Sequence, residues 1–376
     1  MKETRNKTVL IILFAAVILL PFPLWAVLGG RLDFTLNENR TLAEKPVFSL
    51  EEIDAYPQAY EAWLNDHLPF RSLMIRSYNT IEYRLLRSTL SYMVLYGKDG
   101  WLFHRDRYDG DPVSLYRGLR IPQEEHLEQI RNNMLTTRDN LAKEGVEFIL
   151  FFTPLKERMY AEYMPDAYGA PAEHYALQTV VDYLRETTDL RIVYPYEEMQ
   201  EAKEALGEDG LLFYKADSHW NELGAYVGTV PLLREMGIEL PPYDSEELTI
   251  TTAPADKEDL SWLANIEGMI DPGITYSVTG YDKHDLVCTG GDFNDRLSFE
   301  AKGADPRRVL MKHDSFAEAM EDVFCSQFSE TLLAHNFAFT DDDFDNELVG
   351  GFRPDVFVYE IGERNCVGAL MGYVYE

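Results

Sequence analysis

Two short segments of this sequence carry residue types that could do nucleophilic chemistry. In the first, Ser315 follows Asp314 directly after an apolar, strand-like run, and a helix is predicted to begin just after it. A serine at that place lies at the positive end of a helix dipole, where its own backbone N–H can stabilise an oxyanion. Ser and Asp are also ordinary residues at a helix N-cap, so this segment alone leaves both interpretations open.

The second segment places an aspartate two residues before a histidine. A serine nucleophile needs a base that takes its proton, and the base needs a carboxylate that fixes its tautomer. His219 would accept the Ser315 proton and later return it, while Asp217 would hold the imidazole and stabilise its cation. Trp220 is expected to pack beside them or to line the pocket, and Asn221 to cap the next helix. The Asp-x-His pair alone is equally consistent with a surface loop.

A metal site is the competing interpretation of the same region. Its candidate ligands are Asp217, His219, His313 and Asp314. Their spacing matches no known ligand set, and a catalytic metal must also keep an open coordination position. The sequence therefore predicts no metal and no cofactor, and a metal hydrolase stays the weaker alternative.

From about residue 122 the pattern alternates between strands and helices. Helices are expected at 123–144, 174–187, 222–236 and 316–328, and strands at 146–152, 190–193, 211–213, 308–311, 331–335 and 356–360. This alternation predicts an α/β fold with a mainly parallel sheet and helices on both faces. Ligands bind at the carboxyl ends of such strands, which is where both candidate segments would lie. Residues 238–306 interrupt the alternation and are expected to form an irregular or β-containing insertion.

The N-terminal residues predict a membrane-spanning helix. Lys2, Arg5 and Lys7 precede an uncharged, mostly apolar run over residues 8–30. About 20 apolar residues suffice to cross a bilayer, and the basic flank stays in the cytoplasm. A cleaved signal peptide is the alternative, but its apolar core is usually shorter. We therefore expect a single-pass anchor in the cell membrane, with the bulk of the chain outside the cytoplasm.

The predicted organisation has three parts. Residues 1–30 form the cytoplasmic tip and anchor, residues 31–110 a juxtamembrane region, and residues 111–376 the α/β domain. The juxtamembrane region is expected to hold an extended stalk at 34–46, helices over 49–88 that are broken at Pro69, and a β-hairpin over 94–104. The hairpin prediction rests on a Gly-Lys-Asp-Gly turn, because a left-handed turn position favours glycine.

Composition excludes several classes of protein. The 376 residues include 34 Lys and Arg against 65 Asp and Glu, which gives a net charge of −31. That balance argues against a nucleic-acid partner, because phosphate binding needs a basic face. The 46% of hydrophobic residues exclude a disordered acidic chain. The three cysteines allow one disulfide at most and are expected to be buried small apolar residues.

Several short segments, spread in order over most of the chain, match one known family. They are Glu38–Arg40 with Leu42 and Pro46, Asn65–Arg71, Gly97–Phe103, Thr153–Lys156 with Tyr160, Asp217–Asn221 with Gly224 and Ala225, Asp314–Phe316, and Pro354–Val356 with Glu363 and Arg364. With these segments the chain resembles the SGNH-hydrolase-like proteins of bacterial exopolysaccharide O-acetylation, the alginate branch, and their DHHW relatives.

The resemblance implies an SGNH-like domain with a catalytic triad of Asp217, His219 and Ser315. This order is permuted relative to ordinary SGNH esterases, in which the serine comes first. It also implies acetyl transfer to a surface or secreted polysaccharide, often with a membrane-bound acyltransferase that delivers the acetyl group. Lys156 and Arg364 each follow a predicted strand and would orient the substrate or pair with a carboxylate.

The sequence departs from the family pattern in two respects. Ordinary esterases have glycine before Asp-Ser, whereas this chain has His313, which would crowd the turn or line the pocket. No carbohydrate-binding module is evident, so the polymer would be held by residues 238–306 or by a partner. The acidic balance favours a neutral or zwitterionic acceptor over a polyuronate. A carbohydrate acetylesterase and a catalytically inactive glycan-binding or assembly protein remain alternatives.

Overall fold

The computed structural model describes residues 2–32, 41–50, 53–86, 92–207, 210–338 and 344–375. Most of the predicted stalk and the Glu38–Arg40 segment lie outside the described residues. The chain divides into two compact units, one made of residues 1–91 and 261–270 and the other of residues 92–260 and 271–376. The hairpin over 94–104, predicted to belong with the preceding helices, thus lies in the larger unit.

The smaller unit is helical. Its elements are α1 (Lys2–Leu19), α2 (Pro21–Leu32), α3 (Tyr56–Asp66), α4 (Arg71–Ile81) and the π-helical turn η1 (Glu82–Leu86). Residues Lys7–Gly29 have a mean hydropathy of 2.7 and are long and apolar enough to cross a membrane, as a signal sequence also would be. Pro69 lies between α3 and α4, so the predicted helix break is confirmed. Residues 261–270 join this unit through a hydrogen bond of 2.7 Å from Asn79 Nδ2 to the Ala264 carbonyl.

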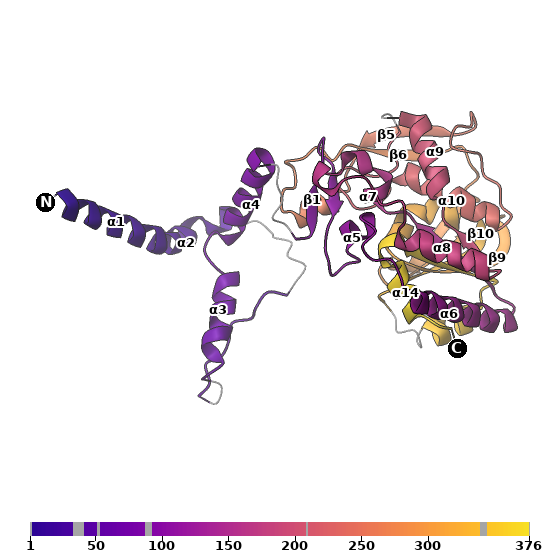
Figure 1. The fold of residues 1–376 in the computed structure, drawn as a ribbon, viewed down its shortest axis with the longest axis horizontal. Coiled ribbons are helices and arrows are strands. Elements are labelled where there is room, and N and C mark those ends of the chain that lie inside the picture. The colour runs from indigo at the N-terminus through magenta and orange to yellow at the C-terminus, as the bar shows by residue number, and fades with distance from the viewer. Residues whose placement is uncertain are drawn as a thin grey trace. The chain divides into compact units, whose positions relative to one another are not determined.

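A seven-stranded sheet forms the centre of the larger unit, in the order β4-β3-β11-β9-β10-β8-β7. Figure 1 labels two of its strands, β9 and β10. The strands are β3 (Glu147–Thr153), β4 (Arg191–Val193), β7 (Leu286–Gly291), β8 (Arg296–Ala301), β9 (Asp305–His313), β10 (Phe328–His335) and β11 (Val356–Gly362). The first five in the sheet are parallel, and β8 and β7 add an antiparallel edge. The predicted α/β fold with a mainly parallel sheet is confirmed.

Helices cover both faces of this sheet. One face packs against α6 (Glu124–Lys143), α8 (Ala176–Thr187) and α14 (Cys366–Gly372), and the other against α9 (Tyr196–Leu206), α10 (Glu222–Glu235) and the turns η5 (Ser315–Met320) and η6 (Glu321–Cys325). Strand β11 shows why the central strands are continuous apolar runs in the sequence: both of their faces are buried. Val356 and Val358 belong to one core, whereas Phe357 and Tyr359 belong to the other.

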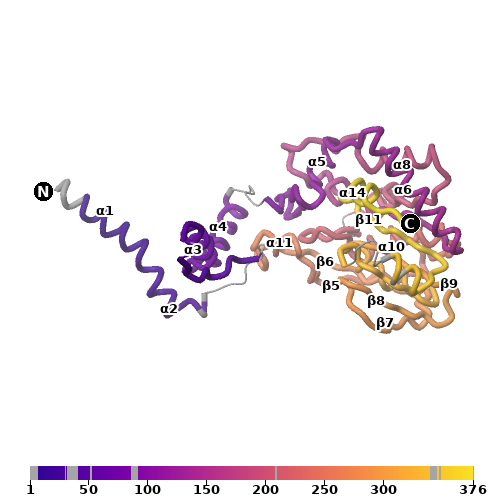
Figure 2. The backbone as a smooth tube through the Cα atoms, turned by 90° about the horizontal axis from the view of Figure 1, so that it is seen from below, coloured from indigo at the N-terminus to yellow at the C-terminus, as the bar shows by residue number. Residues whose placement is uncertain are grey.

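Shorter elements surround the sheet. They are β1 (Val94–Tyr96), β2 (Leu102–His104), α5 (Pro112–Tyr116), α7 (Lys156–Met159), η2 (Ala161–Tyr163), η3 (Asp166–Tyr168), β5 (Thr249–Pro254), α11 (Asp259–Leu263), β6 (Ile274–Thr279), η7 (Phe344–Val349), α13 (Gly350–Phe352) and η8 (Glu363–Asn365). The predicted insertion over 238–306 therefore contains the β5–β6 hairpin and the β7–β8 edge, which Figure 2 shows at one margin of the body. The β1–β2 turn has the expected left-handed residues, Asp99 at φ 51° and Gly100 at φ 82°.

Two predicted elements are wrong. Residues 211–213 form no strand, because their backbone groups bond elsewhere. The N–H groups of Leu211 and Leu212 donate to tyrosine hydroxyls. The carbonyls of Leu211 and Leu212 accept from the side chain and the backbone N–H of Asn221. The predicted helix at 316–328 is the 3-10 turn η5 followed by the π-helical turn η6, and β10 already begins at Phe328. An apolar residue at every fourth position does not distinguish these helix types.

The cysteines follow the sequence prediction in part. Cys325 and Cys366 are buried, and all three cysteines are free thiols. Cys288 is exposed on the edge strand β7, so the expectation that it is buried is wrong. An edge strand faces solvent on one side, which alternation in the sequence does not reveal.

Candidate active site

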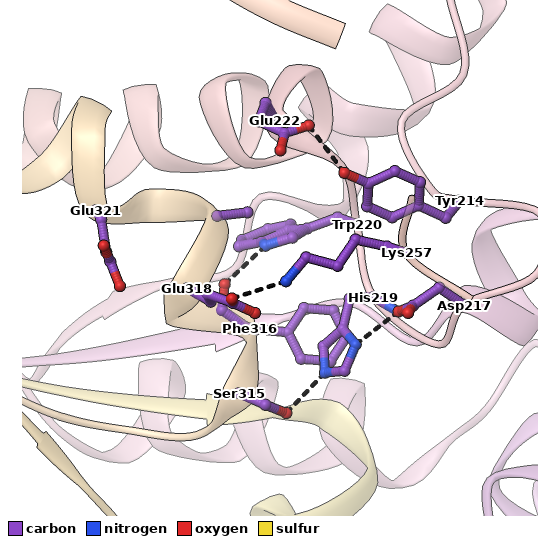
Figure 3. Close-up of a pocket in the computed structure, with 11 residues that line it drawn as sticks. Tyr214, Asp217, His219, Trp220, Glu222, Lys257, Ser315, Phe316, Glu318 and Glu321 are labelled. Atoms are coloured by element: carbon purple, nitrogen blue, oxygen red, sulfur yellow. Dashed lines mark hydrogen bonds and ion pairs between the residues drawn. The ribbon is translucent and has the colours of Figure 1, made fainter. Parts of the chain in front are cut away.

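Three side chains from distant parts of the chain meet at the carboxyl edge of the sheet. Ser315 follows the end of β9, and Asp217 and His219 lie on the loop that precedes α10. His219 Nε2 lies 2.7 Å from Ser315 Oγ, and His219 Nδ1 lies 2.8 Å from Asp217 Oδ1 (Figure 3). The Nδ1–H donates to the carboxylate, which leaves Nε2 free to accept the hydroxyl proton.

The loop that holds the histidine is fixed by its own hydrogen bonds. Asp217 Oδ1 also accepts from the His219 backbone N–H at 2.9 Å, and Oδ2 accepts from the Asp259 backbone N–H at 3.0 Å. Asn221 caps α10 by accepting from the Gly224 N–H at 3.0 Å, as predicted. These bonds set the position of the imidazole before any substrate arrives.

The electrostatics of the pair favour a basic histidine. Burial alone would lower the pKa of His219, but the hydrogen bond and charge of Asp217 outweigh it and raise the pKa above its ordinary value. Burial would raise the pKa of Asp217, but the hydrogen bond and charge of His219 hold it well below the usual range. The carboxylate is therefore ionised at neutral pH and stabilises the imidazolium.

The turn that carries Ser315 is anchored through Asp314. Asp314 Oδ1 accepts from the Phe316 N–H at 2.9 Å, and Oδ2 accepts from the Gly362 N–H at 2.9 Å. The Asp314 N–H donates to Glu360 Oε2 at 2.8 Å. Burial raises the pKa of Glu360 well above its ordinary value, with the Asp314 charge adding to the shift. The turn is thus tied to β11, the neighbouring parallel strand.

A second hydroxyl lies on the other side of the imidazole. Ser218 Oγ donates to Asp259 Oδ2 at 2.6 Å and lies 3.3 Å from His219 Nδ1, which makes Ser218, His219 and Asp259 a triad-like arrangement. Nδ1 already serves the closer Asp217 carboxylate, at 2.8 Å. Ser315 faces the opposite ring nitrogen, Nε2, and forms a hydrogen bond with it.

Ser315 opens into a pocket of about 230 Å³. The pocket is lined by Tyr214, Asp217, His219, Trp220, Glu222, Lys257, Ser315, Phe316, Glu318, Ala319 and Glu321. The Ser315 hydroxyl and the His219 ring are therefore accessible to a small acyl group, and acidic side chains form much of the surrounding wall (Figure 3).

Lys156 is buried away from the pocket. Its ammonium donates to three carbonyl oxygens, those of Leu102 at 2.7 Å, Lys215 at 3.1 Å and Asp217 at 2.7 Å. Burial lowers its pKa to about 8. An ammonium has three N–H donors, so none is left for a substrate. Contrary to the predicted substrate contact, the side chain joins the β1–β2 hairpin to the Asp217 loop.

Trp220 and His313 are packed rather than exposed to a ligand. The Trp220 indole N–H donates to the Phe316 carbonyl at 2.9 Å, and one edge of the ring borders the pocket. His313 is fully buried beside Phe293 and His335, with its Nδ1–H donating to the Asp314 carbonyl at 2.7 Å. Its ring thus neither crowds the serine nor lines the pocket, and burial lowers its pKa to about 4.

Arg364 lies in η8, just after β11. It borders a separate cavity of about 20 Å³ together with Ser218 and Phe316, and it does not line the Ser315 pocket. Its guanidinium lies 3.6 Å from Asp109 Oδ2. The positive charge of Arg364 acts on His219 by lowering the histidine pKa. Arg364 thus influences the site through its charge and does not line the Ser315 pocket.

The four candidate metal ligands do not come together in one cluster. Asp217, His219 and Asp259 offer ligand atoms within 4.8 Å of one another, whereas His313 and Asp314 lie outside this cluster. Asp314 is engaged by backbone N–H groups on both oxygens. The metal hydrolase built on His313 and Asp314 is therefore wrong in its ligand set.

Two carboxyl groups that hold the site in place were not predicted, and neither were the pocket-lining residues Tyr214, Glu222, Lys257, Glu318, Ala319 and Glu321. Asp259 belongs to the insertion over 238–306, and Glu360 is buried in the centre of β11. A glutamate inside an otherwise apolar strand is a signal that the sequence does contain, because buried carboxyls need a partner. Asp259 has no such signal, since it lies in an irregular acidic stretch.

The family model of the SGNH hydrolase-like domain of the acetyltransferase AlgX matches residues 94–261. This chain is related to the AlgX and AlgJ family of SGNH hydrolase-like proteins. The matched range includes Asp217, His219 and Asp259 but ends before Ser315, so the family match does not itself extend to the serine.

The AlgJ relatives are distant. The probable alginate O-acetylase AlgJ of Pseudomonas syringae pv. tomato is 24% identical over 259 residues, which cover 66% of this chain and 58% of that protein. The probable AlgJ of Pseudomonas aeruginosa is 27% identical over 172 residues, covering 44% of this chain and 39% of that protein. The chain thus spans less than two thirds of the length of these relatives.

Solved structures include similar chains. The structure of Bacillus cereus PatB1 with a sulfonyl adduct superposes with a TM-score of 0.53 at 14% identity. The superposition covers 75% of this chain and all of the PatB1 chain. The O-acetyltransferase domain of Pseudomonas putida AlgJ gives a TM-score of 0.45 at 18% identity, over 75% of this chain and 94% of that one. The PatB1 likeness supports the fold of the AlgJ-related chain.

Proposed function

We propose that this AlgJ-related chain transfers an acetyl group through Ser315 to a hydroxyl of an extracytoplasmic polysaccharide. The observation that carries the proposal is the 2.7 Å contact between His219 Nε2 and Ser315 Oγ, with Asp217 on the opposite ring nitrogen. A hydroxyl, a base and a carboxylate in this order form the arrangement that activates serine in acyl transfer.

The reaction proceeds in two halves. His219 Nε2 takes the Ser315 proton as Oγ attacks the acetyl carbonyl, and the N–H of Ser315, at the start of η5, donates to the oxyanion. The tetrahedral intermediate collapses, the donor's leaving group receives the proton from His219, and acetyl-serine remains. A sugar hydroxyl then gives its proton to His219 and attacks the acetyl carbon, and the proton returns to Ser315 when the ester is released.

Water in place of the sugar would make the same site an acetylesterase. Both reactions share the acetyl-serine intermediate and differ only in what accepts the acetyl group. The relatives' names favour transfer, since the matched proteins are called probable alginate O-acetylases. We further propose that Lys7–Gly29 anchors the protein in the membrane and that a membrane-bound acyltransferase supplies the acetyl group.

Hydrolysis of a chromogenic acetyl ester by the full chain in detergent tests the proposed nucleophile. Ser315→Ala should lower kcat/KM by roughly 10³-fold or more, because the covalent route is lost. Ser218→Ala is the matched control and should keep activity within tenfold. Loss of activity in Ser218→Ala with full activity in Ser315→Ala would assign the nucleophile to Ser218 and overturn the proposal.

A further inference from the structure

The walls of the Ser315 pocket carry more negative than positive charge. Lys257 is the one lysine or arginine among the residues that line it, and its ammonium already pairs with Glu318 at 2.7 Å. Glu222 accepts hydrogen bonds from Tyr214 and Thr275 hydroxyls, which satisfy the carboxylate without neutralising it. The wall therefore keeps a net negative charge after its internal pairing.

Glu321 stands out within this wall. Glu321 is one of the residues that line the pocket, on the η5–η6 side, and no dashed line reaches it in Figure 3. Among the described residues it forms neither a hydrogen bond nor an ion pair, and the neighbouring Asp322 pairs with Lys283 instead. The half-buried side chain is thus an unused acceptor at a pocket that must admit the acceptor sugar.

We propose that the acceptor of this site is a sugar that carries no carboxylate, neutral or amine-bearing, and that Glu321 excludes uronic acids. This inference rests on the proposed acyl transfer and adds the acceptor class. A carboxylate that enters the pocket would meet Glu321 and Glu222 without a free cation to pair with. This repulsion between like charges lowers the affinity for an anionic sugar more than the affinity for a neutral one. A hydroxyl or ammonium would instead donate to Glu321.

The assay pH must be chosen so that the Glu321 carboxyl is ionised. Burial raises its pKa to about 7, and the charges of Glu318 and Asp322 add to the shift while Lys257 opposes it. Glu321 is therefore largely ionised at pH values about one unit above its pKa. The experiment belongs there, at low ionic strength, since salt screens charges at partly exposed sites.

The acceptor enters where the leaving group of an ester departs, so esters with charged alcohol parts probe the same space. The full chain in detergent is assayed with nitrophenyl acetate, the anionic meta-acetoxybenzoate and the cationic acetylcholine. Glu321→Gln should raise kcat/KM for the anionic ester by about fivefold and lower it for the cationic ester by a similar factor, with nitrophenyl acetate within twofold. Intrinsic ester reactivity cancels because each ester is compared between variants.

Glu186→Gln is the matched control, because it removes the same charge from an exposed position in the last turn of α8, on the opposite face of the sheet. It should leave all three values unchanged. Hydrolysis with the same charge preference in wild type and Glu321→Gln would overturn the acceptor proposal alone. Failure of wild type to hydrolyse any of the three esters would contradict the acyl-transfer proposal, and with it this one.

Discussion

At the scale of single residues, the site depends on a histidine whose charge is controlled by two carboxylates. Asp217 raises the pKa of His219 directly through its hydrogen bond, and the Asp259 charge adds to the shift from 3.6 Å away. The imidazole must be neutral to accept the Ser315 proton. The rate should therefore rise with pH through the His219 pKa, which lies above its ordinary value, and fall on the acid side.

Asp217→Asn tests this control. The variant removes the group that raises the His219 pKa and orients its tautomer, so kcat/KM should fall by roughly 10³- to 10⁴-fold. The midpoint of the remaining pH–rate profile should move to lower pH. The measurement is ester hydrolysis between pH 5 and about 9.

Asp259→Asn is the matched comparison for that profile. It removes a neighbouring charge and leaves the Asp217 hydrogen bond in place, so the loss of rate should stay near tenfold or less, with a smaller shift of the midpoint. A larger effect from Asp259→Asn than from Asp217→Asn would show that the Ser218–His219–Asp259 arrangement, rather than Asp217, controls the base.

At the scale of elements, alternating strands and helices in the sequence predicted the parallel sheet and the edge at which the site lies. Ser315 could be placed there because β9 ends just before it. Its meeting with His219 could not be derived, since the loop before α10 is irregular. That loop is shaped by side-chain bonds, such as those of Asn221 and Lys156 to backbone carbonyls, which no periodicity encodes.

The end of β11 and the serine turn fit together without space for a side chain. A Cβ added at Gly362 would lie 2.8 Å from Asp314 Oδ2, an atom already held by the Gly362 N–H. Gly362→Ala should displace Asp314 and with it Ser315, lowering kcat/KM by roughly 10- to 100-fold and the free energy of unfolding by about 1–2 kcal/mol.

Gly368→Ala provides the control for that substitution. A Cβ at Gly368 meets nothing within 4 Å, and the residue lies in helix α14. Its rate should equal that of wild type and its stability should not fall, because alanine favours a helix over glycine. Equal rates in both variants would show that the contact between β11 and the serine turn does not position the nucleophile.

Lys156 connects the β1–β2 hairpin to the Asp217 loop, and its removal should lower mainly the stability of the fold. Lys156→Met removes the ammonium donor from three carbonyl oxygens, of which the Lys215 carbonyl keeps the Leu102 N–H, and should lower the free energy of unfolding by roughly 2–4 kcal/mol. Lys98→Met, at an exposed lysine that pairs with Asp166, should change it little. Denaturant unfolding measures both, and coincident midpoints for the two variants would contradict the role assigned to Lys156.

At the scale of the whole molecule, composition and the N-terminal segment constrain where and on what the protein acts. The net charge of −31 already argued against nucleic acid and polyuronates. The acidic pocket wall supports the argument against polyuronates at the site itself, where net charge alone says nothing. The sequence could not supply it, because Glu222, Lys257 and Glu321 come together only in the folded chain.

The N-terminal segment carries a prediction of its own. If Lys7–Gly29 is an uncleaved anchor, the expressed protein should stay in the membrane pellet after an alkaline wash, and its intact mass should include the first thirty residues. A mature chain that begins after this segment and is released by the wash would instead identify a cleaved signal peptide.

The most direct test of the whole account is to locate the covalent intermediate. The full chain is mixed with nitrophenyl acetate, quenched in acid during turnover, digested and sequenced by mass spectrometry. The account predicts one acetyl group on Ser315, absent from Ser315→Ala and from unreacted protein. Acetyl on Ser218, or turnover with no acetylated serine, would contradict the central claim that Ser315 carries the acyl group.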